Sequence, residues 1–323
     1  MRECVFLFNL DAIVQDKNSK KNSSILEFIN DNAQHCYFKQ DCIDENWKKM
    51  VVAIGNSESD IAMMEKADIR IGYGGIKEVM PEILSTVDYA IYEEKKLVEF
   101  LERLLQEEKM TLSRTVIISC AGMGNRLGLG TTKALLEVDG KTLIVRHLEQ
   151  LQEEKDVRIV VGYQASSMIE AVLKCRSDVT FVFNHEYQNT GTGASVALAA
   201  KYANEYVLSL DGDLIVHPED MKKILACQGE FVGGVVTESD DPWMLQTYMQ
   251  EGTEYVRAFE KNNGNYEWNG VAQVKSERLR GSGHVFQLIE PHLPIPFMLL
   301  RTREIDTQND YEVAQKWVKN GFC

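Results

Sequence analysis

The chain has 323 residues, of which 44% are hydrophobic and 26% are charged, and its formal net charge is -14 at pH 7. This length can supply two domains with separate cores, and the composition is that of a folded globular protein. The acidic balance argues against a protein whose main task is to neutralise nucleic-acid phosphates, because that task needs clustered lysine and arginine.

The seven cysteines are scattered and include no CxxC pair. A disulfide framework or a zinc site is therefore not expected, and a reducing compartment fits this pattern best. No apolar run reaches the roughly 18 residues of a membrane helix, and the N-terminus lacks a signal-peptide pattern. We expect a cytoplasmic protein with neither a membrane nor a nucleic-acid partner.

The first third of the chain alternates strand and helix signals, which is typical of a parallel sheet wrapped by helices. We expect strands at residues 5–8, 50–54, 69–71 and 89–92, and helices at 59–67, 76–87 and 95–105. The polar stretch QEEKMTLSR (106–114) is interpreted as a linker. The predicted domains are residues 1–110 and 111–323, with a boundary near residue 111.

A second alternating series begins with a strand at 115–119 and continues with strands at 157–161, 179–183 and 206–210 and a helix at 167–174. The glycine-rich sequence CAGMGNRLG follows the first of these strands. Its glycines let the backbone approach an anion, and Arg126 and Lys133 add positive charge. A tight turn that serves only packing is the alternative. The pattern GxxxxGK[ST] is absent, which disfavours a P-loop.

AGMGNRLG, followed by KALLEVDGKTLI, resembles the signature of nucleotidyltransferases that join a nucleoside triphosphate to a phosphorylated sugar or alcohol. Thr132 and Thr142 stand where that signature usually has proline. The resemblance covers almost all of 114–323 and implies an α/β fold with a mixed, Rossmann-like sheet. It is strongest to the bacterial phosphocholine and aminoethylphosphonate cytidylyltransferases. They transfer a cytidylyl group from CTP to a small phosphorylated or phosphonate acceptor and release pyrophosphate.

The resemblance also implies a Mg²⁺ site and catalytic groups. Asp213, in VLSLDGDLIV, and Asp306 with Glu304, in REIDTQNDYEVAQKW, would hold the ion. Arg126 and Lys133 are the implied catalytic residues. Thr307 and Asp310 predict a helix start directly after these acids.

The implied nucleotide-binding residues are Ala121, Gly122, Met123, Gly124, Asn189, Thr190, Gly191, Ser195 and Asp211. For Asp211, a turn or capping role is the alternative. The implied acceptor-binding residues are Trp243, Glu260 and Trp268, although tryptophans also serve as plain core residues. A sugar-1-phosphate transferase using UTP or dTTP is the alternative function.

The segments FNLDAIV and IGNSESDIAMMEKADIRIGYGG resemble the first and last motifs of the haloacid dehalogenase family. Asn9 and Asn56 replace two acids of those motifs, whereas Asp11 and Asp60 remain. An amide is a poor nucleophile and a weak Mg²⁺ ligand. We therefore expect a truncated, Rossmannoid, catalytically inactive module that serves folding, regulation or association of copies through helix 95–105. A phosphohydrolase, or a weak metal site at Asp11 and Asp60, is the alternative.

Overall fold

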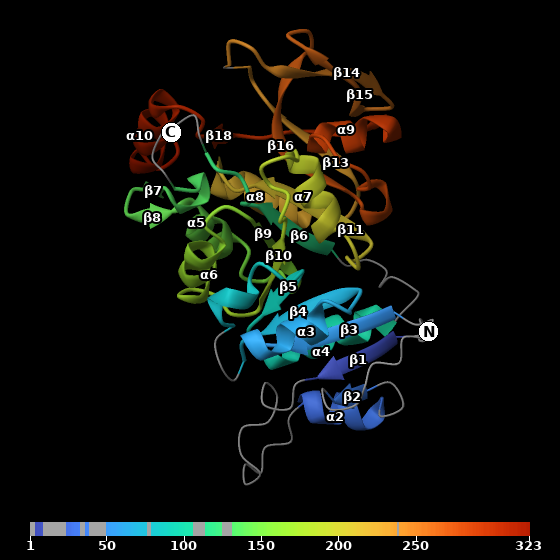
Figure 1. Ribbon diagram of the computed structural model, residues 1–323. Coiled ribbons are helices and arrows are strands. Elements are labelled where there is room, and N and C mark those ends of the chain that lie inside the picture. The colour runs from blue at the N-terminus through green and yellow to red at the C-terminus, as the bar shows by residue number, and fades with distance from the viewer. Residues whose placement is uncertain are drawn as a thin grey trace. The chain divides into compact units, whose positions relative to one another are not determined.

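The structure is a computed structural model, and it describes residues 4–8, 24–32, 36–38, 50–75, 79–105, 114–124, 131–237 and 239–323 (Figure 1). The chain forms two compact units. The first contains residues 1–109 and 176–185, and the second contains residues 110–175 and 186–323. Among the described helices, none combines the length and the apolar character needed to cross a bilayer.

The first unit is built on a sheet with the strand order β2-β1-β3-β4-β5-β10. The strands β1 to β5 are parallel, and β10 pairs antiparallel with β5. Their bounds are Cys4–Phe8 (β1), Cys36–Phe38 (β2), Met50–Gly55 (β3), Ile69–Tyr73 (β4), Tyr89–Ile91 (β5) and Val179–Phe183 (β10). The α-helices of this unit are α2 (Ser24–Asp31), α3 (Ile61–Met64) and α4 (Glu94–Leu105). The expected parallel sheet is thus present.

Two details of the first unit differ from expectation. The predicted helix at 76–87 is wrong: residues 76–78 lie outside the described part, and the rest contains only a 3-10 turn, η3 (Pro81–Ile83). Met80 is extended, and Pro81 begins a single short turn that ends at Leu84. The predicted helix at 59–67 is split into a 3-10 turn, η2 (Glu58–Asp60), and the four residues of α3.

Helix α4 follows the prediction for 95–105 closely. Its apolar residues Leu97, Phe100, Leu101 and Leu104 are buried. The helix packs on β5 and α2 within the first unit. The apolar face of α4, the helix proposed from the sequence for association of copies, therefore packs against other elements of its own unit.

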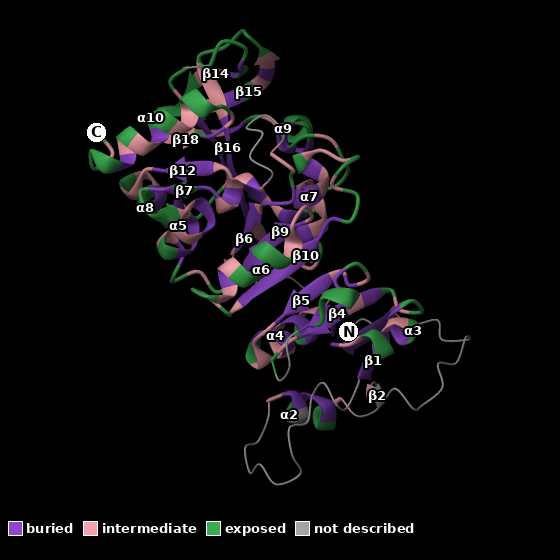
Figure 2. Ribbon diagram, turned by 60° about the vertical axis from the view of Figure 1, so that its left-hand side comes forward, coloured by how far each residue is buried: buried purple, intermediate pink, exposed green. Residues whose placement is uncertain are grey.

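The second unit is built on a mixed sheet in which β9, β6 and β11 are parallel and β11 pairs antiparallel with β16. Beyond β16 the sheet continues through β13, β14 and β15 (Figure 1), and it also contains β17. The strands are β6 (Arg114–Ser119), β9 (Val157–Val161), β11 (Tyr206–Asp211), β13 (Phe231–Val235), β14 (Trp243–Gln250), β15 (Thr253–Lys261), β16 (Tyr266–Lys275) and β17 (Ile295–Leu299). Most residues of β6, β9 and β11 are buried (Figure 2). This confirms the mixed α/β fold.

The remaining elements surround this sheet. The helices are α5 (Leu143–Gln150), α6 (Ala165–Leu173), α7 (Thr192–Ala199), α8 (Pro218–Ala226), α9 (Val285–Ile289) and α10 (Gln308–Lys319). The 3-10 turns are η5 (Lys133–Leu135), η6 (Ser276–Arg278) and η7 (Glu290–His292). The short strands are β7 (Glu137–Val138), β8 (Lys141–Thr142), β12 (Leu214–Val216) and β18 (Thr302–Glu304). Helix α7 packs against β6 and β9.

A buried arginine fixes the C-terminal end of α7. The Arg158 side chain is fully buried and donates hydrogen bonds to the carbonyl oxygens of Ala199, Lys201 and Tyr202 at 2.6–2.8 Å. Its charge is balanced by Asp156, at 3.3 Å. A cation at this end also opposes the negative end of the helix dipole.

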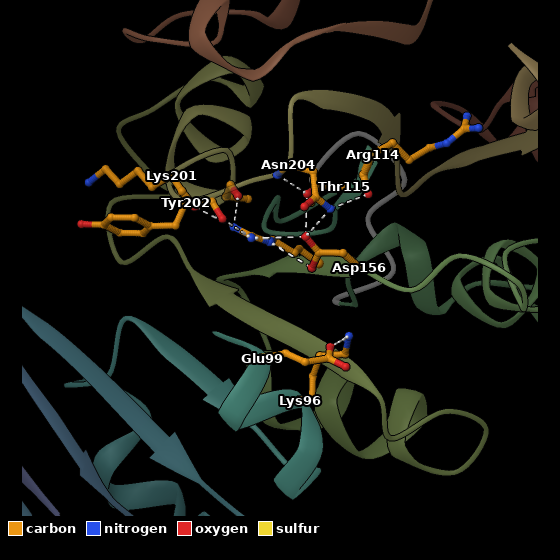
Figure 3. A network of polar contacts seen from close by, with 10 residues as sticks. Lys96, Glu99, Arg114, Thr115, Asp156, Lys201, Tyr202 and Asn204 are labelled. Carbon is orange, nitrogen blue, oxygen red and sulfur yellow. Dashed lines mark hydrogen bonds and ion pairs between the residues drawn. The ribbon is translucent and has the colours of Figure 1, made fainter. Parts of the chain in front are cut away.

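The Asp156 carboxylate extends this network to β6 (Figure 3). It accepts a hydrogen bond from the Thr115 hydroxyl at 2.6 Å, and that hydroxyl in turn accepts one from the Asn204 N–H at 2.9 Å. The start of β6, the segment before β9 and the segment after α7 are thereby joined. Buried polar groups of this kind are stabilising only while all their partners are present.

We expect the substitution Arg158→Met to destabilise the protein by about 3–5 kcal/mol, because it leaves the Asp156 carboxylate buried without its cation. The urea midpoint of unfolding measures this loss. Arg301→Met is the matched control: Arg301 also pairs with an aspartate, Asp220, but is 56% exposed. Its loss should be about 0–1 kcal/mol. Equal losses in the two variants would contradict the role assigned to Arg158.

Candidate active site

The two acidic segments predicted to share a metal ion are brought together by one short strand pair. Strand β12 follows Asp213 and pairs antiparallel with β18, with Leu214 opposite Glu304. The Ile305 N–H also donates to the Asp213 carbonyl at 3.1 Å. As a result, carboxylate oxygens of Asp213, Glu304 and Asp306 lie within 4.8 Å of one another. Residues about ninety positions apart in the sequence thus form one acidic cluster.

An apolar cluster holds this arrangement from behind. Ile215 lies two residues after Asp213, Ile305 separates Glu304 from Asp306, and Leu136 lies three residues after Lys133. All three isoleucine and leucine side chains belong to one buried cluster, which also contains Val138, Leu143, Ala314 and Val318. Burying these side chains fixes the segments that carry the charged groups.

The start of α10 follows the prediction. The Thr307 hydroxyl accepts the Asp310 N–H, and the Asp310 carboxylate accepts the Thr307 N–H at 2.7 Å, which completes a capping box. The same carboxylate accepts the Asp306 N–H at 3.1 Å. The backbone of the acidic segment is thereby fixed at the residue that carries its second aspartate.

Lys133 is placed inside the acidic cluster. Its ammonium lies 2.7 Å from Asp213 Oδ2 and makes a second, shorter ion pair with Asp306 Oδ1. Burial would lower the pKa of Lys133, but these two carboxylates outweigh it, so the pKa is raised. Lys133 is therefore positively charged at neutral pH.

The glycine-rich loop lies against this lysine. Gly124 has φ +62°, and a Cβ there would stand 2.9 Å from Cγ of Lys133. Of the predicted loop residues, Ala121 is buried, Gly122 is exposed, and Met123 and Gly124 are half-buried. Arg126 lies outside the described residues. The structure therefore joins the loop, Lys133 and the acidic cluster, as the motif predicted, while the place of Arg126 stays a prediction.

Asp211 is the last residue of β11, and its carboxyl group lies in an unusual environment. Its Oδ1 atom is buried and has no hydrogen-bond partner among the described residues. Burial, with repulsion from Asp213, raises the pKa of Asp211 to about 8. Buried polar atoms are almost always paired, so an unpaired carboxylate oxygen beside a cluster of acids indicates a place for a cation or a ligand donor.

Glu304 has a similarly perturbed carboxyl group. Burial by the surrounding protein and repulsion from Asp213 and Asp306 raise the pKa of Glu304 to about 8. Glu304 as a residue is exposed, so the nearby carboxylates are a principal cause of this rise in its pKa. Four carboxyl groups beside one lysine cannot all ionise at neutral pH without a further cation, so a divalent ion at this place would favour their charged forms. The oxygen-only donor set suits Mg²⁺.

Sequence reasoning missed one residue of this site. Gly270, on β16, has φ +80°, and a Cβ there would stand 2.4 Å from Asp211 Oδ2. A side chain at residue 270 would displace the carboxylate. The letters YEWNG contain the signal, because a glycine inside a strand often marks a close approach, but nothing in the sequence says what approaches it.

The predicted base-binding residues lie at the start of α7. The Gly191 Cα lies so close to the Gly283 carbonyl that a Cβ would stand 2.2 Å from its oxygen. Asn189 and Thr190 are bonded within their own loop, to the side chain and the carbonyl of Glu186 respectively. Ser195 is 5% exposed. These residues gather around one helix start, and their binding of a nucleotide stays a prediction.

The predicted acceptor residues gather in part. The ring centroids of Trp243 and Phe286 are 4.4 Å apart, and those of Phe259 and Phe286 are 5.4 Å apart. Trp268 packs edge-on to Phe259, with 5.5 Å between the ring centroids. Trp243 is 39% exposed, and the Lys261 ammonium lies 5.6 Å from its ring centroid. Glu260 accepts a hydrogen bond from Asn263. The two tryptophans thus belong to one aromatic group, with a cation already at the Trp243 ring.

In the first unit, Asp60, the described acid of the segment expected to resemble a dehalogenase motif, is bonded within its own turn. Asp60 is fully buried, and its Oδ2 accepts hydrogen bonds from the N–H groups of Asn56 and Ser57 and from the Ser57 hydroxyl at 2.9–3.2 Å. A carboxylate engaged in this way stabilises its own turn. Asn9 and Asp11 lie outside the described residues, so their part of the motif stays untested.

In metal-free protein, we expect Asp211→Asn to raise the melting temperature more at pH 8 than at pH 4. The folded-state pKa of Asp211 is raised from 3.8 to about 8, so the stability that its proton contributes is lost as the pH rises through that window. The asparagine variant avoids this loss, and its advantage at pH 8 should be roughly 2–4 °C. Thermal unfolding in EDTA at both pH values measures it.

Asp178→Asn is the control of opposite sign. Its ion pair with Arg176 lowers the pKa of Asp178, so the carboxylate contributes stability above its unfolded pKa. That variant should melt lower than the parent protein at pH 8. An advantage of Asp211→Asn that is the same at pH 4 and pH 8 would contradict the prediction.

Known proteins are similar to this chain over much of its second unit. Residues 116–273 match the MobA-like NTP transferase domain. A protein of Rubrobacter xylanophilus named bifunctional IPC transferase and DIPP synthase is 31% identical over 156 residues, which cover 46% of this chain and 35% of that protein. The bifunctional protein GlmU of Nitratiruptor is 23% identical, covering 51% of this chain and 38% of that protein. The chain thus spans little more than a third of the length of these relatives.

Solved structures share the fold. The CTP:phosphocholine cytidylyltransferase LicC of Streptococcus pneumoniae aligns with a TM-score of 0.53 and 21% identity, over 64% of this chain and 99% of that one. The inositol-1-phosphate CTP transferase of T. maritima aligns with a TM-score of 0.53 and 17% identity, over 67% and 100%. Residues 116–273 of this chain are thus similar to the MobA-like NTP transferase domain, and the second unit shares its fold with these two transferases.

Proposed function

We propose that residues 111–323 transfer a cytidylyl group from CTP to a small phosphorylated or phosphonate acceptor and release pyrophosphate. The observation that carries this proposal is the convergence of Asp213, Glu304 and Asp306 with Lys133 beside the glycine-rich loop. Acidic side chains, a lysine and exposed backbone amides are the groups that phosphoryl and nucleotidyl transfer requires.

In this proposal the chain contributes charge and position. An oxygen of the acceptor's phosphate or phosphonate attacks the α-phosphorus of CTP, and the bond to the β-phosphate oxygen breaks. The acceptor is already an anion, so no strong general base is needed. Lys133 offsets negative charge at the α-phosphorus, and the amides of residues 121–124 hold the triphosphate. Asp213, Glu304 and Asp306 would hold Mg²⁺, which neutralises phosphate charge when bound.

The choice of CTP rests on the resemblance of the sequence to cytidylyltransferases. The names of two similar structures, a phosphocholine cytidylyltransferase and an inositol-1-phosphate CTP transferase, point the same way. The GlmU relatives, together with a similar UDP-glucose pyrophosphorylase, favour the second candidate, a sugar-1-phosphate transferase that uses UTP or dTTP. The acceptor is proposed to contact the aromatic group that contains Trp243 and Trp268, and also Glu260, which follows Phe259 of that group on β15.

The test is pyrophosphate release from the full chain with Mg²⁺, each of the nucleoside triphosphates, and a panel of acceptors. The panel contains phosphocholine, 2-aminoethylphosphonate, inositol 1-phosphate and sugar 1-phosphates. We expect release with CTP and one acceptor of the first three kinds. Release only with UTP or dTTP and a sugar phosphate would support the second candidate, and no release with any pair would defeat both.

Asp213→Asn should reduce turnover by roughly 10³-fold, since loss of a metal-binding carboxylate removes several kcal/mol of charge stabilisation. Steady-state kinetics with the active pair of substrates measures the loss. Asp11→Asn is the control, because we expect the dehalogenase-like module to be inactive, and its turnover should match that of the parent protein. The reverse result would place the chemistry in the first unit.

Gly270→Ala should lower kcat/KM by roughly 10²-fold, because a methyl group there would stand 2.4 Å from Asp211 Oδ2 and displace that carboxylate. Gly252→Ala is a matched control: residue 252 has φ +82°, so alanine is equally strained there, but its Cβ would meet nothing within 4 Å. The control should lose stability and keep its kcat/KM. Equal kinetic losses in both variants would attribute the effect to backbone strain alone.

A further inference from the structure

The acidic cluster is bridged by a cation that belongs to the chain. The Lys133 ammonium contacts Asp213 Oδ2 at 2.7 Å and also contacts Asp306 Oδ1, so it joins two of the three carboxylates. Its side chain is 13% exposed. The lysine therefore neutralises part of the cluster from a position that solvent hardly reaches.

A divalent ion at this cluster would use the same carboxylate oxygens. Mg²⁺ binds carboxylate oxygens at about 2.0–2.1 Å, which is closer than the lysine's 2.7 Å to Asp213 Oδ2. A bound ion and the ammonium would then be two cations held by the same two side chains. Their mutual repulsion in a largely buried place opposes simultaneous occupancy.

The Lys133 ammonium could find other partners at the glycine-rich loop. Its aliphatic stem lies against Gly124, where a Cβ would stand 2.9 Å from Cγ. Residue 124 belongs to the loop that, in the proposed function, holds the triphosphate. A nucleotide bound at this loop would offer phosphate oxygens within the lysine's neighbourhood, and these could replace the carboxylates as partners of the ammonium.

The local fold permits such a change of partner. Lys133 begins the 3-10 turn η5, and Leu136, the residue directly after this turn, is buried in the apolar cluster behind the site. The turn is thus fixed at its C-terminal end, whereas the four-carbon stem of the lysine can rotate. Neither carboxylate has to move for the ammonium to leave.

We propose that Lys133 occupies the acidic cluster in the nucleotide-free protein and leaves it for the phosphates when a divalent ion enters with the nucleotide. This inference rests on the proposed function. Its consequence is a coupling between two ligands: the free protein binds a divalent ion weakly, and the nucleotide strengthens that binding because it gives the displaced ammonium a new partner.

The test is the binding of Mn²⁺, used as the probe and followed by electron paramagnetic resonance, without nucleotide and with an α,β-methylene analogue of CTP. The variant Lys133→Met keeps the aliphatic stem and removes the charge. Without nucleotide it should bind Mn²⁺ about tenfold more tightly than the parent protein, within the usual range of coupling between ligands. The analogue should strengthen Mn²⁺ binding in the parent protein and do so much less in the variant.

Lys141→Met is the matched control, because Lys141 is an exposed lysine paired with Glu149, and it should bind Mn²⁺ as the parent protein does. Lys133→Gln, which also removes the charge, guards against misfolding of the methionine variant, and thermal unfolding in EDTA checks both. Equal or weaker Mn²⁺ binding by both folded Lys133 variants without nucleotide would overturn the inference.

The two proposals fail in different ways. Turnover by the parent protein together with unchanged Mn²⁺ affinity in the Lys133 variants would remove the coupling and leave the transferase. Tighter Mn²⁺ binding by those variants, with no turnover on any substrate pair, would leave the displaceable lysine and remove the proposed reaction.

Discussion

The second unit depends on holding like charges together. Asp213, Glu304 and Asp306 repel one another, and Asp211 adds a fourth carboxyl group close by. Surface acids in this position would simply rotate apart. Here the pairing of β12 with β18 and the apolar cluster of Leu136, Ile215 and Ile305 hold together the backbone segments that carry the acids, because separating these segments would expose buried side chains. Lys133 offsets part of the repulsion that remains.

The first unit shows how the same type of residue can serve the fold instead. The Asp60 carboxylate is as buried as any acid in the described part of the chain, yet its Oδ2 is engaged by backbone N–H groups of its own turn. Asp211 lacks such donors for its Oδ1. Burial alone therefore does not distinguish a ligand-binding acid from a structural one. The partners of each oxygen atom do.

The sequence predicted the parts of the second unit that follow from local pattern. Strands 115–119, 157–161 and 206–210, the capping box at Thr307, and the convergence of Asp213 with Glu304 and Asp306 all agree with the structure. What it could not supply was tertiary: the contact of Gly270 with Asp211, and the burial of Arg158 under the end of α7. Both depend on residues far apart in the chain, and an arginine within a strand carries no signal of burial.

Strand β10 follows the linker in the sequence but belongs to the first unit of the fold. Its residues 179–183 lie inside the stretch that matches the nucleotidyltransferase domain, yet they pair antiparallel with β5 of the first unit. Division of the gene at the linker would strip β5 of its outer neighbour and leave unpaired backbone groups along an apolar strand, which invites aggregation. Residues before the linker therefore do not complete the sheet of the first unit by themselves.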